Sequence, residues 1–433
     1  MRRFALGVLA VQGYVVRQTL RTIGRLGLPL SGAFPESVRG NLRIEIVAAV
    51  AYGLFYAIAI SFMPVVLRRL GASSGLLAVY TAQTYLGSVL STFGVLLMRR
   101  RRPLVFAAAC WLAARSLLLW TFLIVDAVWL LALNAMFWLL ESLPAPAYAR
   151  IIQAIYPVAY RGRALAVVRA WMVLAMLIAT PLAGMALDYA GYRVLFPIAG
   201  ALGVTSTLLF TRLRVDEQAL PPLRIGSLRG IWSILGENRR FALYLFGFSV
   251  YGVGFLMSFP FFAIVQVDRL KLSYSAIGYL GLAQSLCWLL GNMYWGRLVD
   301  RRGGLWVLRR NVAIALLVPF TYIWAFDAWT LLPAFIAQGI ISAGVDLGVI
   351  STGMELASPD RVVEYSALQA TIIGLRGMLG PFVGVALVGL GLPERAVFAI
   401  GCGLIVAAWA LLGTVLVGTE RRGARGEGLE ARG

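Results

Sequence analysis

The chain has 433 residues, of which 60% are hydrophobic and 13% are charged, and its formal net charge is +20. A soluble globular chain usually carries about a quarter of charged residues, so this composition excludes water as the main solvent. Because the apolar runs are continuous and do not alternate with polar residues, they predict membrane-spanning helices and exclude a barrel of strands.

Apolar stretches of about 20 residues predict twelve spanning helices. Six lie in the first half of the chain, at 44–67, 75–98, 103–125, 128–149, 164–188 and 192–211. Six lie in the second half, at 241–266, 275–296, 311–326, 329–354, 364–389 and 395–417. We therefore predict an all-α integral membrane protein with two six-helix bundles, at 41–211 and 241–417.

The remaining segments are basic, and they predict the orientation of the chain. With both termini in the cytoplasm, most of the 39 Lys and Arg residues fall on the cytoplasmic side, as the positive-inside rule requires. Residues 1–40 are then an amphipathic helix at the membrane surface, for which a signal peptide is the alternative. Residues 212–240 form a cytoplasmic linker and 418–433 a cytoplasmic basic tail. We expect a monomeric multi-pass protein of the plasma membrane, with the lipid bilayer and no nucleic acid as a partner.

The chain lacks residues that several kinds of chemistry require. It has three cysteines, all inside apolar runs, and no histidine, so we expect no disulfide framework, metal or cofactor. The run from Gly71 to Gly75 has the Gly-x-Ser-x-Gly spacing of serine hydrolases, but no histidine is present to act as the base. The single lysine, Lys271, is followed by leucine and does not fit a phosphate-binding loop. We therefore expect neither an enzyme nor an ATP-driven pump.

The two halves of the chain resemble each other at a shift near 200 residues. Arg69-Leu70 matches Arg269-Leu270, and the run of seven residues from Pro181 matches the run from Pro381. A duplicated six-helix unit explains these ordered matches.

One loop motif resembles that of a known family. After the span 275–296 the chain reads Gly296-Arg-Leu-Val-Asp300-Arg301-Arg302-Gly303, which fits the Gly-x-x-x-Asp-Arg-x-Gly motif of the major facilitator superfamily. Together with the repeat and the topology, the resemblance extends from residue 41 to 417. It implies two bundles around a central cavity and solute movement by alternating access.

This motif suggests a reversible clasp between the halves. Asp300 can accept hydrogen bonds from arginines or cap a helix N-terminus, whereas the alternative is that it only anchors the loop at the lipid headgroups. The equivalent run at 96–103 lacks the glycine and the aspartate, so we expect an asymmetric clasp.

Four charged residues inside predicted spans are the candidates for coupling solute movement to protons. Arg115 and Glu141 lie at similar depth and could neutralise each other, while Asp346 and Arg376 form a second candidate couple at less well matched depths. A structural ion pair is the alternative for Arg115 and Glu141. Three glutamates close to the predicted cytoplasmic interface need no functional explanation: Glu45, Glu355 and Glu364.

The resemblance implies that the first and fourth helices of each half line the cavity. Glu141 and Asp346 lie on such helices, and so do polar and aromatic candidates for the lining: Tyr52, Tyr56, Asn134, Trp138, Tyr251, Gln338 and Ser342. An aromatic cavity with a carboxylate suits a hydrophobic or cationic solute. We therefore expect a secondary transporter of a small-molecule solute, coupled to protons or another ion, that exports hydrophobic or cationic compounds. The alternatives are proton-coupled uptake of a small metabolite and a scaffold that flips lipid or transports nothing.

Overall fold

The computed structural model describes residues 34–86, 102–215, 228–358 and 361–430, and within them the chain is almost entirely helical. The predicted surface helix before residue 34, part of the linker and the clasp loop at 96–101 lie outside these residues.

The first half of the chain contains six successive helical segments. The first is formed by α2 (Glu36–Phe55), the π-helical η2 (Tyr56–Ile60) and α3 (Met63–Arg69), and the second by α4 (Ser74–Gln83). The third comprises α6 (Pro103–Leu117) and η3 (Leu118–Leu123), and the fourth α7 (Ala127–Ser142) and α8 (Ala145–Ile155). The fifth and sixth are α9 (Val158–Ala190) and α10 (Tyr192–Phe210).

The second half follows the same order after the linker helix α11 (Leu228–Glu237). Its first segment consists of α12 (Arg239–Leu256), α13 (Phe259–Ile264) and the π-helical η5 (Val265–Arg269), and its second is α14 (Tyr274–Arg302). Next come α15 (Gly304–Ala315) with α16 (Leu317–Trp324), and η6 (Trp329–Leu331) with α17 (Leu332–Leu356). The last two are α18 (Val362–Gly389) and α19 (Glu394–Glu430).

Ten helical segments among the described residues are long and apolar enough to cross a membrane. The predicted count of twelve includes two segments that do not meet this measure. The described part of α4 has 10 residues, and α14 has 29 residues but carries polar side chains such as Gln284 and Asn292. The polarity of α14 has a structural reason, because its middle lines the central cavity described below.

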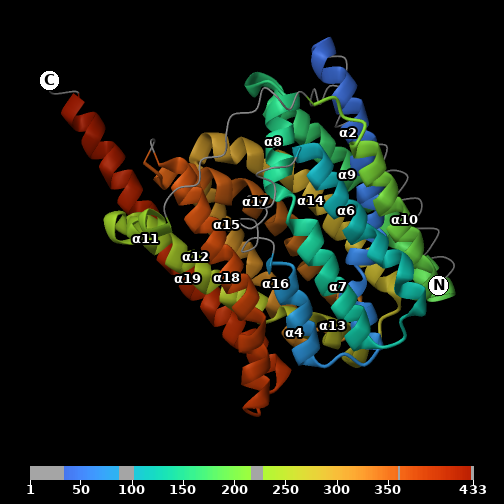
Figure 1. Cartoon of the computed structure of the whole chain (residues 1–433). Coiled ribbons are helices and arrows are strands. Elements are labelled where there is room, and N and C mark those ends of the chain that lie inside the picture. Colours follow the sequence, from blue (N-terminus) through green and yellow to red (C-terminus); the bar gives the residue numbers. More distant parts are fainter. Residues whose placement is uncertain (1–33, 87–101, 216–227, 359–360, 431–433) are drawn as a thin grey trace.

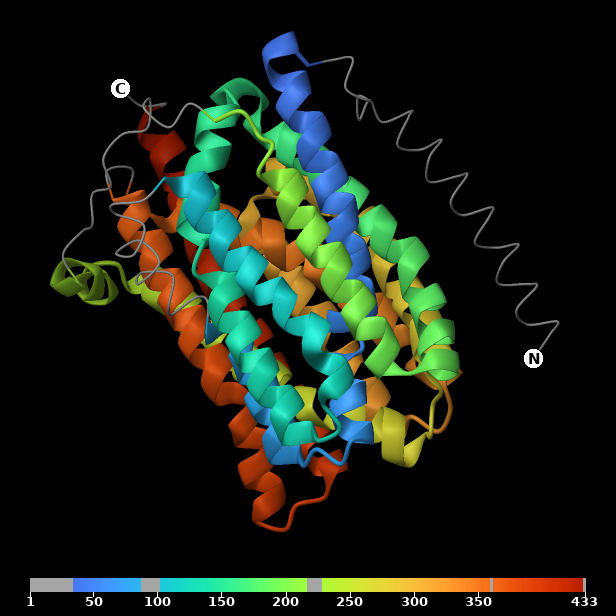
Figure 2. The same cartoon turned by 45° about the vertical axis from the view of Figure 1, so that its right-hand side comes forward.

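The helices form two groups that lie side by side. In Figure 1, α2 and α6 to α10 lie on the right, and α12 and α15 to α19 lie on the left. The groups join where α14 packs against α9 and where α18 packs against α4. Figure 2 shows that the chain enters α2 at the end of the bundle opposite the α3 to α4 turn. We call the end that contains Phe34 proximal and the end that contains the turn 70–73 distal; the proximal end is the predicted cytoplasmic side.

Equivalent positions of the two halves adopt the same local conformations. Ser73 and Ser273 cap α4 and α14 by accepting hydrogen bonds from backbone N–H groups three residues on. Gly191 and Gly391 follow α9 and α18 with positive φ of 73° and 93°. These shared turns, 200 residues apart, are the structural counterpart of the repeat in the sequence.

The linker helix α11 is tied to the start of α18 at the proximal end. Arg361 donates hydrogen bonds to Glu237, at 2.6 Å, and to Glu364, at 2.7 Å. Hydrogen bonds from Ser233 and Arg361 lower the pKa of the Glu237 carboxyl below its ordinary value. The carboxylate therefore stays ionised at neutral pH and holds α11 against the second bundle.

Candidate functional site

A cavity of about 400 Å³ lies between the two halves. Four of the predicted lining residues line it: Tyr56, Trp138, Gln338 and Ser342. Other segments of both halves add aromatic rings, amides and hydroxyls to the lining. Among these residues are Tyr80, Tyr85, Trp288, Tyr322, Gln266, Gln284, Thr84 and Ser285. None of the described residues that line the cavity is charged, so the cavity offers stacking and hydrogen bonding without a net charge.

Three other predicted lining residues do not line this cavity. Tyr52 lies against Arg115, whose guanidinium carbon is 4.8 Å from the ring centroid. Asn134 is 1% exposed and donates a 2.7 Å hydrogen bond to Gln83, which joins α7 to α4. Tyr251 is buried and stacks on Phe248. The family resemblance placed each residue on a helical segment that lines the cavity, but it did not give the direction in which the side chain points.

Contacts between the two halves lie at the distal end of the molecule. Arg68 at the end of α3 pairs with Asp268 of η5. Arg69 donates to the carbonyl of Leu272 at 2.6 Å, and its guanidinium lies over the ring of Tyr274. We call this group the distal gate. Arg68 and Asp268 are 200 residues apart in the sequence, because equivalent helix ends of the repeat meet there.

A second contact of the distal gate joins α9 to α14. Asp188 accepts hydrogen bonds from the backbone N–H groups of Tyr274 and Ser275, at 2.9 and 2.7 Å. Carboxylates are favourable at helix N-termini. The two helices also touch at glycines, since a Cβ on Gly184 would lie 2.5 Å from the Tyr274 carbonyl oxygen, and one on Gly278 would lie 2.9 Å from that of Thr180.

Valine in place of Gly184 is expected to prevent closure of the distal gate, because its side chain would overlap the backbone of α14. The measurement is thiol labelling of an Ile277→Cys reporter, which lies in the cavity wall, with a reagent added from the distal side. We expect labelling at least tenfold faster with Gly184→Val. Gly162→Val is the control, because its Cβ would meet nothing within 4 Å. Equal labelling in the presence and absence of Gly184→Val would contradict this account of the gate.

Asp346 forms an ion pair that crosses from one half to the other. Arg169 of α9 donates to its Oδ2 at 3.1 Å, and the two side chains are 56% and 38% exposed. Asp346 follows the cavity residue Ser342 by four positions on α17, so both lie on the same helical face. The predicted couple of Asp346 with Arg376 is wrong. Asp346 pairs with Arg169 instead, and Arg376 turns toward α12.

Arg376 packs inside the second half. Its guanidinium donates to the backbone carbonyl of Phe248 and lies 4.0 Å from the centroid of that ring. In the part of the chain that the structure describes, no carboxylate pairs with it. Cation–π contact with Phe248 and Tyr251 therefore replaces the predicted ion pair.

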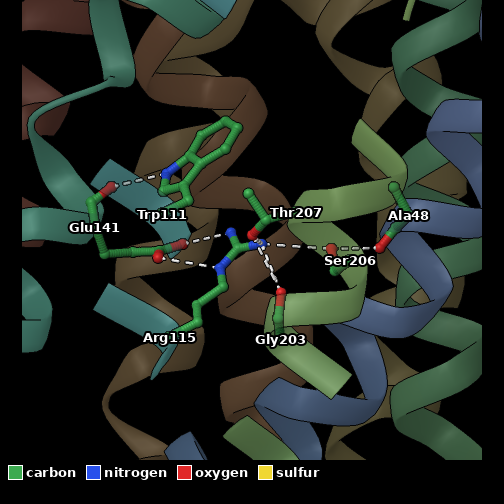
Figure 3. A network of polar contacts seen from close by, with 7 residues as sticks. All are labelled: Ala48, Trp111, Arg115, Glu141, Gly203, Ser206 and Thr207. Atoms are coloured by element: carbon green, nitrogen blue, oxygen red, sulfur yellow. Dashed lines mark hydrogen bonds and ion pairs between the residues drawn. The ribbon is translucent and has the colours of Figure 1, made fainter. Parts of the chain in front are cut away.

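Arg115 and Glu141 meet as their similar depth predicted. Figure 3 shows the fork of two hydrogen bonds, at 2.8 and 3.2 Å, between the guanidinium and the carboxylate. The same guanidinium donates to Thr207 of α10 at 2.8 Å, and the indole of Trp111 donates to the Glu141 carbonyl. The side chains of Arg115 and Glu141 are 6% and 9% exposed, and neither lines the cavity. This geometry joins three helices of one half and fits a structural ion pair.

The loop motif ends α14 and begins α15. Asp300, Arg301 and Arg302 are exposed, and Gly303 has a positive φ of 82° that allows the tight turn. The N-terminus of α15 is capped by Glu355 of α17, which accepts hydrogen bonds from the backbone N–H groups of Gly304 and Leu305. Glu355 therefore holds this turn within the second half, a role that its position in the sequence did not reveal.

A second glutamate for which the sequence suggests no role, Glu45, is buried. Glu45 of α2 is 2% exposed, and its two oxygens accept hydrogen bonds from Tyr148 and Tyr156 at 2.9 and 2.5 Å. The partners are more than 100 residues away, so helical periodicity could not identify them. Its place inside an apolar run was the only signal.

Comparisons with known proteins agree on one architecture. A family model described as Major Facilitator Superfamily matches residues 46–381. A crystal structure of a mutant nucleoside transporter NupG is 12% identical, with a TM-score of 0.69 over 87% of this chain and 99% of that one. An inward-facing, occupied structure of a bacterial homologue of the human lysosomal transporter Spinster is 16% identical, with a TM-score of 0.60 over 89% and 96% of the two chains. No curated protein matches the chain. At these identities the two structures show the fold alone.

Proposed function

The chain belongs to the major facilitator superfamily, whose members carry small solutes across membranes, and we propose that it couples this transport to proton movement. The observation that carries the proposal is the ion pair between Arg169 and Asp346. It joins the two halves, it lies one helical turn from the cavity, and its side chains are partly exposed.

Protonation of Asp346 would remove the attraction that holds the two halves together at this point. The carboxylate is therefore a switch between two arrangements of α9 and α17, and its proton affinity depends on whether Arg169 is near. Solute binding that favours one arrangement then changes proton binding, as linkage requires. With the distal gate and this pair both formed, the structure corresponds in our proposal to the arrangement in which α9 and α17 are held together.

The lining of the cavity supports a solute with a flat ring and several hydrogen-bonding groups. Aromatic side chains such as Trp138 and Trp288 stack on rings, while Gln284 and Gln338 bond to hydroxyls or amides. A nucleoside, the solute named for one of the similar structures, has this chemistry. The aromatic lining also supports the hydrophobic compounds expected from the sequence, but a cation would find no carboxylate among the lining residues. We therefore favour a neutral polar solute and retain hydrophobic compounds as the second candidate.

The direction of transport is a separate part of the proposal. Export in exchange for protons is the expectation from the sequence, and uptake together with protons is the alternative; both use the same cavity and the same carboxylate. In proteoliposomes, solute addition makes the lumen more alkaline under exchange and more acidic under uptake with protons. The sign of the pH change therefore distinguishes the two.

The test is tracer flux in proteoliposomes, with tritiated uridine as the polar probe, tetraphenylphosphonium as the hydrophobic cation, and a dye that reports lumenal pH. We expect uridine flux with a pH change. Gln338→Ala should raise the half-saturating uridine concentration about tenfold through loss of a hydrogen bond, about 1.4 kcal/mol. Gln153→Ala, on an exposed side chain of α8, is the control.

Other outcomes decide between the remaining functions. Flux of tetraphenylphosphonium without flux of uridine would support export of hydrophobic cations and contradict the polar solute. Uridine flux without a pH change would leave an uncoupled carrier. Flux of neither probe, with movement of a fluorescent phospholipid between leaflets, would support the lipid-flipping scaffold.

A further inference from the structure

Three carboxylates among the described residues lie more than one helical turn inside a candidate span: Glu45, Glu141 and Asp346. Glu141 and Asp346 each have an arginine partner. Glu45 has no basic partner within ion-pair distance in the described chain, although it is the least exposed of the three. Its charge when ionised is therefore balanced by hydroxyl groups alone, and burial of such a charge is costly.

The hydroxyl partners of Glu45 differ from an arginine in what they permit. A guanidinium can only donate hydrogen bonds, so it satisfies an ionised carboxylate, which only accepts them. If the carboxylate becomes protonated, its new O–H group faces the N–H groups of the guanidinium and finds no acceptor there. A tyrosine hydroxyl both donates and accepts. When Glu45 is ionised, both tyrosines donate to it. When it is protonated, its O–H group donates to one tyrosine oxygen and that bond is reversed. The carboxyl group thus keeps both hydrogen bonds in either protonation state, while the tyrosine whose bond is reversed turns its own O–H group away from Glu45.

From this arrangement we propose that Glu45 is a proton-binding site of the transport cycle, a role that rests on the proposed coupled function. The proton adds to one carboxylate oxygen from water and returns to water. Tyr148 is only partly buried, and in this proposal the proton passes beside its hydroxyl between Glu45 and the solvent. Tyr156 is fully buried and keeps the second oxygen in place.

The surroundings of Glu45 connect this proton to the ion pair between the halves. On α8, Tyr148 lies close enough to Arg169 of α9 for an electrostatic interaction, and Arg169 holds Asp346. On α6 and α7, the Arg115–Glu141 pair lies beyond Trp111. The ring of Trp111 packs edge-on against that of Tyr148, with 6.1 Å between the two ring centroids. On α10, the uncharged Ser206 donates to the carbonyl of Ala48. A proton on Glu45 therefore changes the charge sensed by Arg169 through one tyrosine.

The first test asks whether Glu45 takes up a proton, independently of any solute. Infrared difference spectra of the purified full-length protein at acidic and alkaline pH report the C=O stretch of protonated carboxyl groups that lack water contact. We expect such a band in the wild type, its loss in Glu45→Gln, and its retention in Glu36→Gln, which changes an exposed residue of the same helix. Should Glu45→Gln fail to fold, Tyr148→Phe serves instead, with a shifted band as the expected result. A band unchanged in these variants, or absent from the wild type, would overturn the proposal.

The second test measures coupling in proteoliposomes with tritiated uridine and the membrane potential clamped. Glu45→Gln should keep uridine exchange at equal pH on both sides, while its accumulation at a gradient of one pH unit falls about tenfold, the contribution of one proton. Accumulation equal to that of Glu36→Gln would refute the role in coupling. If the wild type moves no uridine, the proposed polar solute fails, and the infrared test still decides whether Glu45 binds a proton.

Discussion

Replacement of Arg115 by leucine is expected to lower the free energy of unfolding by about 3–5 kcal/mol, because it leaves the Glu141 carboxylate buried without its partner. The change also removes the hydrogen bonds from Arg115 to α10, so three helices of the first half lose their common contact. For a bundle of this size the loss corresponds to a fall in apparent Tm of roughly 10 °C. The measurement is the fraction of monodisperse protein that survives heating in detergent.

A double variant separates the structural role of this pair from a role in proton coupling. Leucine at both Arg115 and Glu141 removes both charges and should recover most of the lost stability, since apolar residues often replace buried ion pairs without cost. If the pair is structural, the double variant also retains accumulation driven by a pH gradient. Arg193→Leu, at an exposed arginine that bonds a distal carbonyl, is the control, with a loss of about 0–1 kcal/mol. An Arg115→Leu protein as stable as this control would contradict the prediction.

The helices of this protein could be predicted from apolar runs, but their ends could not. The predicted span 311–326 belongs to a helical segment that begins at Gly304, and the predicted end at 417 lies inside α19, which continues to Glu430. Hydropathy detects where the bilayer is, whereas helices continue as long as backbone hydrogen bonds do. Arginines beyond the apolar run find partners on the helix surface, as Arg309 does over the ring of Trp409.

The ion pairs show which features of the site depend on the fold. Arg115 and Glu141 could be paired from depth alone, because adjacent antiparallel helices place residues of similar depth side by side. Arg169 and Asp346 come from different halves, and their contact depends on how α9 and α17 approach each other across the cavity. The partners of Glu45 could not be predicted for a different reason. They are neutral tyrosines, which look like ordinary packing residues in the sequence. Distant pairs and hydroxyl partners therefore had to be read from the structure.

Substitution of Asp346 by asparagine is expected to reduce uridine accumulation about tenfold at a gradient of one pH unit, with the membrane potential clamped. Asparagine keeps the size of the side chain but neither binds a proton nor attracts Arg169. Exchange at equal pH should stay within about threefold of the wild type, because exchange needs the cavity but no net proton movement. Asp327→Asn, which changes a carboxylate of a distal turn, is the control. Loss of exchange together with accumulation would show that Asp346 acts on the solute itself.

The combination of Asp346→Asn with Glu45→Gln tests whether the two carboxylates carry separate protons. Two protons per solute set an accumulation limit of about a hundredfold at one pH unit, and each single variant retains one of the two. The double variant should then exchange uridine without accumulating it. If the two groups share a single proton through Tyr148 and Arg169, each single variant alone already abolishes accumulation and the double variant adds nothing. The comparison of single and double variants therefore measures proton stoichiometry and also shows whether charge passes along this chain of residues.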